Sequence, residues 1–189
     1  MIDFHTHILP GMDDGSQATH ESLQMLTLES EQGAQEILLT PHFYAHFDKI
    51  SSFLERREYS FRKLTKALNE HDMGTPLSLR KGAEVYYFPG IGDAKQIREL
   101  TIEGTDILLL EMPFAQWTDE IYVDVKKLIE KQKLTILLVC FFHTHKDMLF
   151  NPSSKSFFSA IEFVINLLNR IISLYTTAND ICRSQNINY

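Results

Sequence analysis

The order of apolar and polar positions along the chain predicts short strands that alternate with helices. Residues 37–40, 106–110 and 134–139 are almost continuously apolar, which is typical of strands buried in a parallel sheet. Residues 77–87 supply further strand material. Residues 2–8 alternate apolar with polar side chains, so a strand here would have one apolar and one polar face.

The stretches between these runs have the spacing of helices. Ser16 or Thr19 is expected to cap a helix that continues to about Gln32 and stops at Gly33. Its inner side is expected to consist of Leu23, Met25, Leu26 and Leu28.

Three further helices are expected, at residues 50–71, 94–100 and 118–131. The first is amphipathic, because its apolar residues recur at spacings of seven, three and four: Leu54, Phe61, Leu64 and Leu68. Strand and helix therefore alternate through most of the chain, which predicts an α/β fold with a parallel sheet or barrel.

Composition narrows the class of protein. The chain has 189 residues, 44% of them apolar and 23% charged, which suits one soluble globular domain. Its net charge of -7 argues against a nucleic-acid partner. Two unpatterned cysteines favour a reducing compartment, and neither a signal peptide nor an uninterrupted membrane span is visible, so we expect a cytoplasmic protein without membrane insertion.

Candidate metal ligands stand at the very start of the chain. His5 and His7 are two positions apart, about 6.6 Å along a strand, so their imidazoles can converge on one metal ion. Asp13 and Asp14 follow in a turn, where short carboxylates can fold back over the end of the strand. This pattern favours a metal site over ordinary polar positions on a strand.

The other candidate ligands lie in or just after predicted strands. They are His42, Glu84, Glu111 and one of the two later histidines, His143 or His145. The carboxyl ends of parallel strands face one common side, where sites are built from several strands at once. Imidazoles and carboxylates without a thiolate favour manganese, iron or zinc, in a cluster of more than one ion.

Four segments together resemble the bacterial PHP-family protein-tyrosine phosphatases, which are metal-dependent and linked to capsule and exopolysaccharide synthesis. The segments are residues 1–16, Thr40-Pro41-His42, Gly82-Ala83-Glu84-Val85 and Leu110-Glu111-Met112-Pro113-Phe114. They occur in order and at compatible spacings over about residues 1–135.

The resemblance implies a PHP-type distorted (β/α) barrel, a cluster of divalent cations, most simply manganese, and hydrolysis without a covalent intermediate. The implied metal ligands are His5, His7, Asp14, His42, Glu84 and Glu111. Asp14 and Glu84 are the implied catalytic residues, with Glu84 bridging cations. The implied substrate is the tyrosine-rich tail of a cognate bacterial tyrosine kinase, and the chain is also a candidate for homo-oligomer formation.

The chain departs from the family pattern after Leu138. The family has His-Pro-Glu-Arg there and a later Asp-x-His pair, whereas this sequence offers His143 and Lys146 and no histidine beyond His145. We therefore expect a phosphatase-like βα region at residues 1–139, with His143 as a substitute ligand, and a divergent, helical tail at 140–189. The hypothesis is a frameshift or early stop that leaves the barrel incomplete, since a complete barrel has roughly 250 residues.

Three other functions compete with this interpretation. Cys140, which five residues separate from Lys146, could indicate thiol-based phosphatase chemistry, but the segment lacks the glycine-rich loop and the arginine that would cradle phosphate. A small phosphoester such as histidinol phosphate could be the substrate. The altered C-terminal part could also leave a protein that binds the kinase without catalysis.

Overall fold

A computed structural model of the chain describes residues 1–70, 76–113, 115 and 117–139. The expected tail at 140–189, and with it His143, Cys140 and Lys146, lies outside these residues. The expected boundary after residue 139 therefore stays a prediction.

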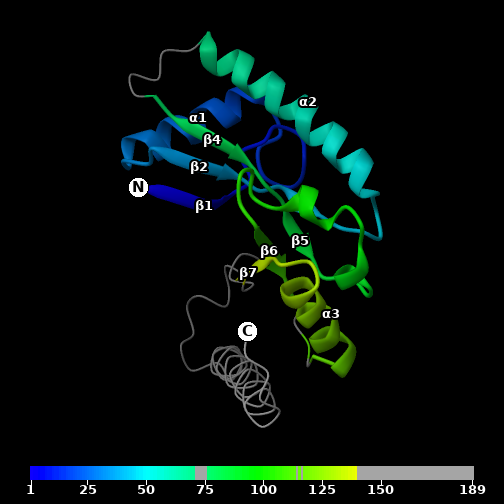
Figure 1. Cartoon of the computed structure of the whole chain (residues 1–189). Helices are drawn as coiled ribbons and strands as arrows, with labels where there is room; N and C mark the ends of the chain where they lie inside the picture. The colour runs from blue at the N-terminus through cyan, green and yellow to red at the C-terminus, as the bar shows by residue number, and fades with distance from the viewer. Residues whose placement is uncertain (71–75, 114, 116, 140–189) are drawn as a thin grey trace, which may run out of the picture. The chain divides into compact units, whose positions relative to one another are not determined.

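The strands of the described part form two sheets, and every strand pair in them is parallel. The first sheet has the order β1-β2-β4, with β1 at Ile2–Thr6, β2 at Glu36–Leu39 and β4 at Ser78–Lys81. The second has the order β3-β5-β6-β7, with β3 at His42–Phe43, β5 at Glu84–Tyr86, β6 at Ile107–Glu111 and β7 at Thr135–Val139. The expected α/β class with parallel strands is confirmed (Figure 1).

The chain passes from the first sheet to the second at two places. Thr40 and Pro41 connect β2 to β3, and Gly82 and Ala83 connect β4 to β5. Residues 77–87, which the sequence suggested as one strand region, are therefore two strands in different sheets. The seam between the sheets is the place where the candidate ligands gather.

Helices α1 (Thr19–Glu31) and α2 (Ile50–Asn69) pack on the face of the first sheet that carries Ile37 and Leu39 (Figure 1). Leu26 of α1 and Leu64 of α2 are fully buried in this core, because the apolar stripe of each helix faces β2. On the opposite side of β2, Leu38 packs with Ile102 and Leu109, so the strand is buried on both faces.

The remaining elements lie around the second sheet. Two short 3-10 helices, η1 at Ile91–Asp93 and η2 at Ile97–Leu100, replace the expected helix at 94–100, and α3 spans Asp119–Glu130. In α3, Ile121, Val125 and Leu128 are buried at helical spacing. Among the described residues no helix has both the length and the apolar character needed to cross a membrane.

Two details of the sequence prediction are wrong. Ala18, not Ser16 or Thr19, is the N-cap of α1; the side chain of Glu21 accepts hydrogen bonds from the backbone N–H groups of Gln17 and Ala18 instead. Leu28 is 56% exposed rather than inward-facing. Apart from these details, the apolar face of β1 is exposed at Ile2 and Phe4, and β1 is an edge strand among the described residues.

Candidate metal centre

The candidate ligands reach the seam between the sheets from four strands. His7 follows the end of β1, His42 follows β2 and begins β3, and Glu84 follows β4 and begins β5. Glu111 is the last residue of β6. His42 and Glu84 are direct partners in the β3–β5 pairing, which places their side chains next to each other.

The end of β1 is fixed by hydrogen bonds to Thr40, the residue that follows β2. The backbone N–H of Thr6 donates to Oγ1 of Thr40 at 3.1 Å, and the N–H of Thr40 donates to the carbonyl of Thr6 at 2.9 Å. Gly15 then lies so close to His7 that an added Cβ would be 2.2 Å from the His7 carbonyl oxygen. The loop after β1 therefore folds back over His7 only because this position has no side chain.

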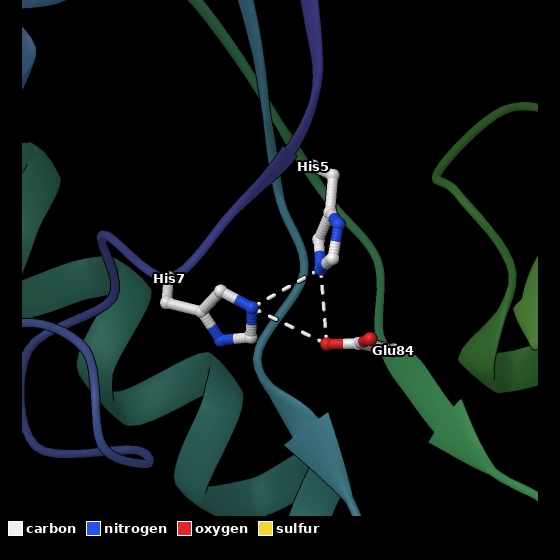
Figure 2. A group of neighbouring side chains, drawn as sticks. All are labelled: His5, His7 and Glu84. Atoms are coloured by element: carbon white, nitrogen blue, oxygen red, sulfur yellow. Dashed lines mark hydrogen bonds and ion pairs between the residues drawn. The ribbon is translucent and has the colours of Figure 1, made fainter. Parts of the chain in front are cut away.

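His5, His7 and Glu84 point toward one another (Figure 2). Nε2 of His5 lies 2.9 Å from Oε2 of Glu84, Nε2 of His7 lies 3.2 Å from the same oxygen, and the two nitrogens are 3.1 Å apart. Glu84 is only 3% exposed. A buried carboxylate oxygen thus faces two imidazole nitrogens from another strand.

Two more groups of potential ligand atoms share residues with this one. The first consists of His7, Asp14 and His42, and the second of His42, Glu84 and Glu111. Nδ1 of His42 lies 3.1 Å from Oε2 of Glu84 and 3.6 Å from Oε2 of Glu111, while Nε2 of His42 lies 3.7 Å from Oδ1 of Asp14. All six metal ligands that were predicted within the described residues therefore lie close together.

Asp13 has a role that sequence reasoning missed. Its Oδ2 accepts hydrogen bonds from Nδ1 of His7 at 2.7 Å and from the backbone N–H of His42 at 2.9 Å, while Oδ1 accepts from the N–H of Gly15 at 3.0 Å. A carboxylate can only accept, so Nδ1 of His7 carries the proton and Nε2 is the nitrogen that faces Glu84. The signal was present: an aspartate two residues before a glycine predicts this kind of turn.

Charges in the centre are strongly coupled. Burial favours the neutral forms of Glu84 and His7, but hydrogen bonds outweigh burial and lower the pKa of Glu84 to about 2 while raising the pKa of His7 to about 10. Burial, followed by the nearby charge of Glu84, raises the pKa of Glu111 to about 7. Burial lowers the pKa of His42. A proton on His7 therefore balances part of the negative charge of the carboxylates.

The donor atoms fit a divalent cation. Nδ1 of His42 and Oε2 of Glu111 are buried and make no hydrogen bond within the described residues, and both point into the group formed with Glu84. Buried polar atoms without hydrogen bonds are uncommon, and a metal ion is one of the partners that satisfies them. Imidazole nitrogens and carboxylate oxygens are also the ligands that manganese, iron and zinc take.

Asp13→Asn is expected to weaken binding of Mn²⁺ by about 10- to 100-fold, because an amide has one accepting oxygen and no charge, so it cannot keep all three hydrogen bonds of Asp13 and orients the His7 ring less firmly. Titration calorimetry of the metal-free protein measures this. Asp93→Asn is the matched control, since Asp93 is exposed and pairs with Lys127 and Lys131. Equal affinities for Asp13→Asn and the parent protein would contradict the positioning role.

Metal binding is expected to release about one to two protons per protein near pH 7. His7, with a pKa of about 10, must lose its Nε2 proton, and Glu111, with a pKa of about 7, is partly protonated. Affinity therefore rises with pH through this range. Calorimetry in two buffers of different ionisation enthalpy measures the release, and Glu111→Gln should release fewer protons. Identical enthalpies in both buffers would rule this coupling out.

Comparisons with known proteins identify the family of this chain. A sequence model of the family "Capsular polysaccharide synthesis, CpsB/CapC" matches residues 1–138. The tyrosine-protein phosphatase YwqE of Bacillus subtilis is 29% identical over 130 residues, which are 67% of this chain and 50% of YwqE. The tyrosine-protein phosphatase CpsB of Streptococcus pneumoniae is 32% identical over 93 residues, 46% of this chain and 34% of CpsB. This chain thus spans about half the length of YwqE.

The fold has a counterpart among solved structures. A chain from the crystal structures of YwqE and CpsB, which are metal-dependent tyrosine phosphatases, superposes with a TM-score of 0.57 at 24% identity. The match covers 73% of this chain and 54% of the other. It confirms the expected PHP-type fold class over the matched part. The roles of the individual site residues stay predictions.

Proposed function

Since this chain belongs to the CpsB/CapC family of capsular polysaccharide synthesis proteins, we propose that it is a metal-dependent phosphatase that hydrolyses phosphotyrosine. The observation that carries the proposal is the convergence of three histidines and three carboxylates at the seam between the sheets. The names of YwqE and CpsB as tyrosine-protein phosphatases support the choice of substrate.

The proposed metal ligands are His5, His7, Asp14, His42, Glu84 and Glu111. His143, the proposed additional ligand, lies outside the described residues. We propose manganese as the metal, and iron and zinc suit the same donor set. Divalent cations bound here would lower the pKa of water and stabilise the charge that develops on a transferring phosphoryl group.

The chain's own residues would prepare the centre for this chemistry. Asp13 orients His7 so that Nε2 faces the other ligands. Glu84, ionised and buried between three imidazoles, keeps negative charge at the middle of the group. Asp14 is 83% exposed at its side chain, so it would border the side from which a substrate approaches. We propose Asp14 and Glu84 as the catalytic residues on these grounds.

We propose that the substrate is the phosphotyrosine tail of a cognate bacterial tyrosine kinase, which would place the protein in the control of capsular or exopolysaccharide synthesis. The family description supports this setting. The proposed compartment is the cytoplasm, where such a tail would be phosphorylated. Homo-oligomer formation, also proposed, would be tested by measuring the mass of the purified protein in solution.

The test is an assay of the full chain with Mn²⁺ against a phosphotyrosine peptide, the same peptide with phosphoserine, and histidinol phosphate. The proposal expects kcat/KM for the phosphotyrosine peptide to exceed the other two by about tenfold or more. Faster hydrolysis of histidinol phosphate would instead indicate a small-molecule phosphoesterase. A protein that binds Mn²⁺ and the kinase tail but hydrolyses none of the three would be a binding protein.

A further inference from the structure

A cavity opens directly beside the candidate metal centre. Its volume is about 400 Å³, and Asp13, Asp14 and His42 form the wall that it shares with the centre. The rest of its lining is largely apolar and aromatic and includes Met12, Phe43, Tyr44, Phe47 and Phe53. A group held at the metal ligands could therefore extend into an aromatic hollow.

The aromatic lining of the cavity is in contact with His42, one of the candidate metal ligands. The ring of Tyr44 stacks on the imidazole of His42, with centroids 5.2 Å apart and an angle of 27° between the planes. Phe47 lies edge-on to Tyr44 at 6.2 Å and is 82% exposed. A large apolar side chain so exposed at the rim of a cavity is costly in water unless something packs against it.

The segment that carries these rings is held in place by the chain itself. The backbone N–H groups of Phe47 and Asp48 both donate to the carbonyl of Tyr44, at 3.0 and 3.1 Å, which closes a tight turn. The carboxylate of Asp48 pairs with the guanidinium of Arg56 on α2. The backbone that carries Phe47 is therefore held in place by contacts within the chain itself, as a selective pocket requires.

We propose that Tyr44 and Phe47 are specificity-determining residues, which hold the phenol ring of the substrate while its phosphate lies at the metal ligands. Aromatic rings prefer edge-to-face and offset contacts at the distances that Tyr44 and Phe47 already adopt with their neighbours. A serine phosphate has no ring to fill the cavity. The inference rests on the proposed function and specifies how the same site distinguishes aryl from alkyl esters.

The test measures binding, which does not depend on turnover. Phenylphosphonate and methylphosphonate are titrated into the full-length, Mn²⁺-loaded protein, its Phe47→Ala and Phe47→Tyr variants, and Tyr59→Ala as control. Tyr59 is an exposed aromatic residue of α2 outside the cavity lining. We expect phenylphosphonate to bind more tightly than methylphosphonate, and Phe47→Ala to reduce this ratio by about three- to tenfold. Phe47→Tyr and Tyr59→Ala should keep the ratio.

The outcomes separate this inference from the proposed function. Equal binding of the two phosphonates, no binding of either, or an unchanged ratio in Phe47→Ala overturns the ring pocket even if the protein hydrolyses phosphotyrosine. If Phe47→Ala reduces the preference for phenylphosphonate but the parent protein hydrolyses no substrate, the ring pocket is supported and the proposed phosphatase function is wrong. A ratio lost equally in Tyr59→Ala would show a general change of structure and also overturn the assignment.

Discussion

Glu84→Gln is expected to lower kcat/KM for a phosphotyrosine peptide by about 100-fold or more and to remove bound metal. One oxygen of Glu84 lies within 3.2 Å of nitrogens from His5, His7 and His42, and Glu84 belongs to two of the three ligand groups found among the described residues. Glutamine keeps the size of the side chain but loses its charge. Metal analysis of the purified variant and steady-state kinetics measure the two effects.

Glu103→Gln is the matched control for this substitution. Glu103 is an exposed carboxylate that pairs with Lys81, and it belongs to none of the groups of candidate ligands. It should keep the metal content and turnover of the parent. If Glu84→Gln also kept both, the centre described here would not be the place of catalysis.

Removing the metal with a chelator is expected to abolish turnover completely, and added Mn²⁺ should restore it. The charge stabilisation and the activated water of this reaction class come from the cations, so the remaining side chains have no substitute for them. Dialysis against EDTA followed by readdition of Mn²⁺, Zn²⁺ or Fe²⁺ also identifies the metal that suits the site. Protein that is metal-free by analysis and still active would exclude this mechanism.

Alkylation with iodoacetamide is the control for the chelation experiment. The chain has two cysteines, Cys140 and Cys182, and neither belongs to the described part. Activity should survive their modification. Inactivation by iodoacetamide without loss of metal would favour thiol chemistry at Cys140 instead.

The helices and buried strands were predictable because their signal is local. The amphipathic spacing at residues 50–71 corresponds to α2, and the apolar runs at 106–110 and 134–139 correspond to β6 and β7. The ligands followed from a topological rule, since polar residues after parallel strands meet on one side. Residues 5, 7, 42, 84 and 111 could therefore be grouped from the sequence pattern, whereas the choice of Asp14 as a ligand came from the resemblance to the phosphatase family.

Other features depend on contacts that no local pattern encodes. The division into two sheets at Gly82 and Ala83 follows from which strands pair, and pairing partners are distant in sequence. Asp13 and Asp14 are adjacent and chemically identical, so only the packing of the loop shows that Asp13 is inside and hydrogen-bonded to His7. The exposure of Leu28 likewise depends on how α1 is rotated against its neighbours.

The position of the candidate ligands at the seam between the two sheets would link metal occupancy to the stability of the fold. One sheet supplies His5 and brings His7 to its end, and the other contains His42, Glu84 and Glu111. A cation bound by ligands from both sheets would stabilise the folded state, because the sheets could separate only if the ion dissociated. Cellular supply of the metal would then set not only how fast the protein works but how long each molecule survives proteolysis.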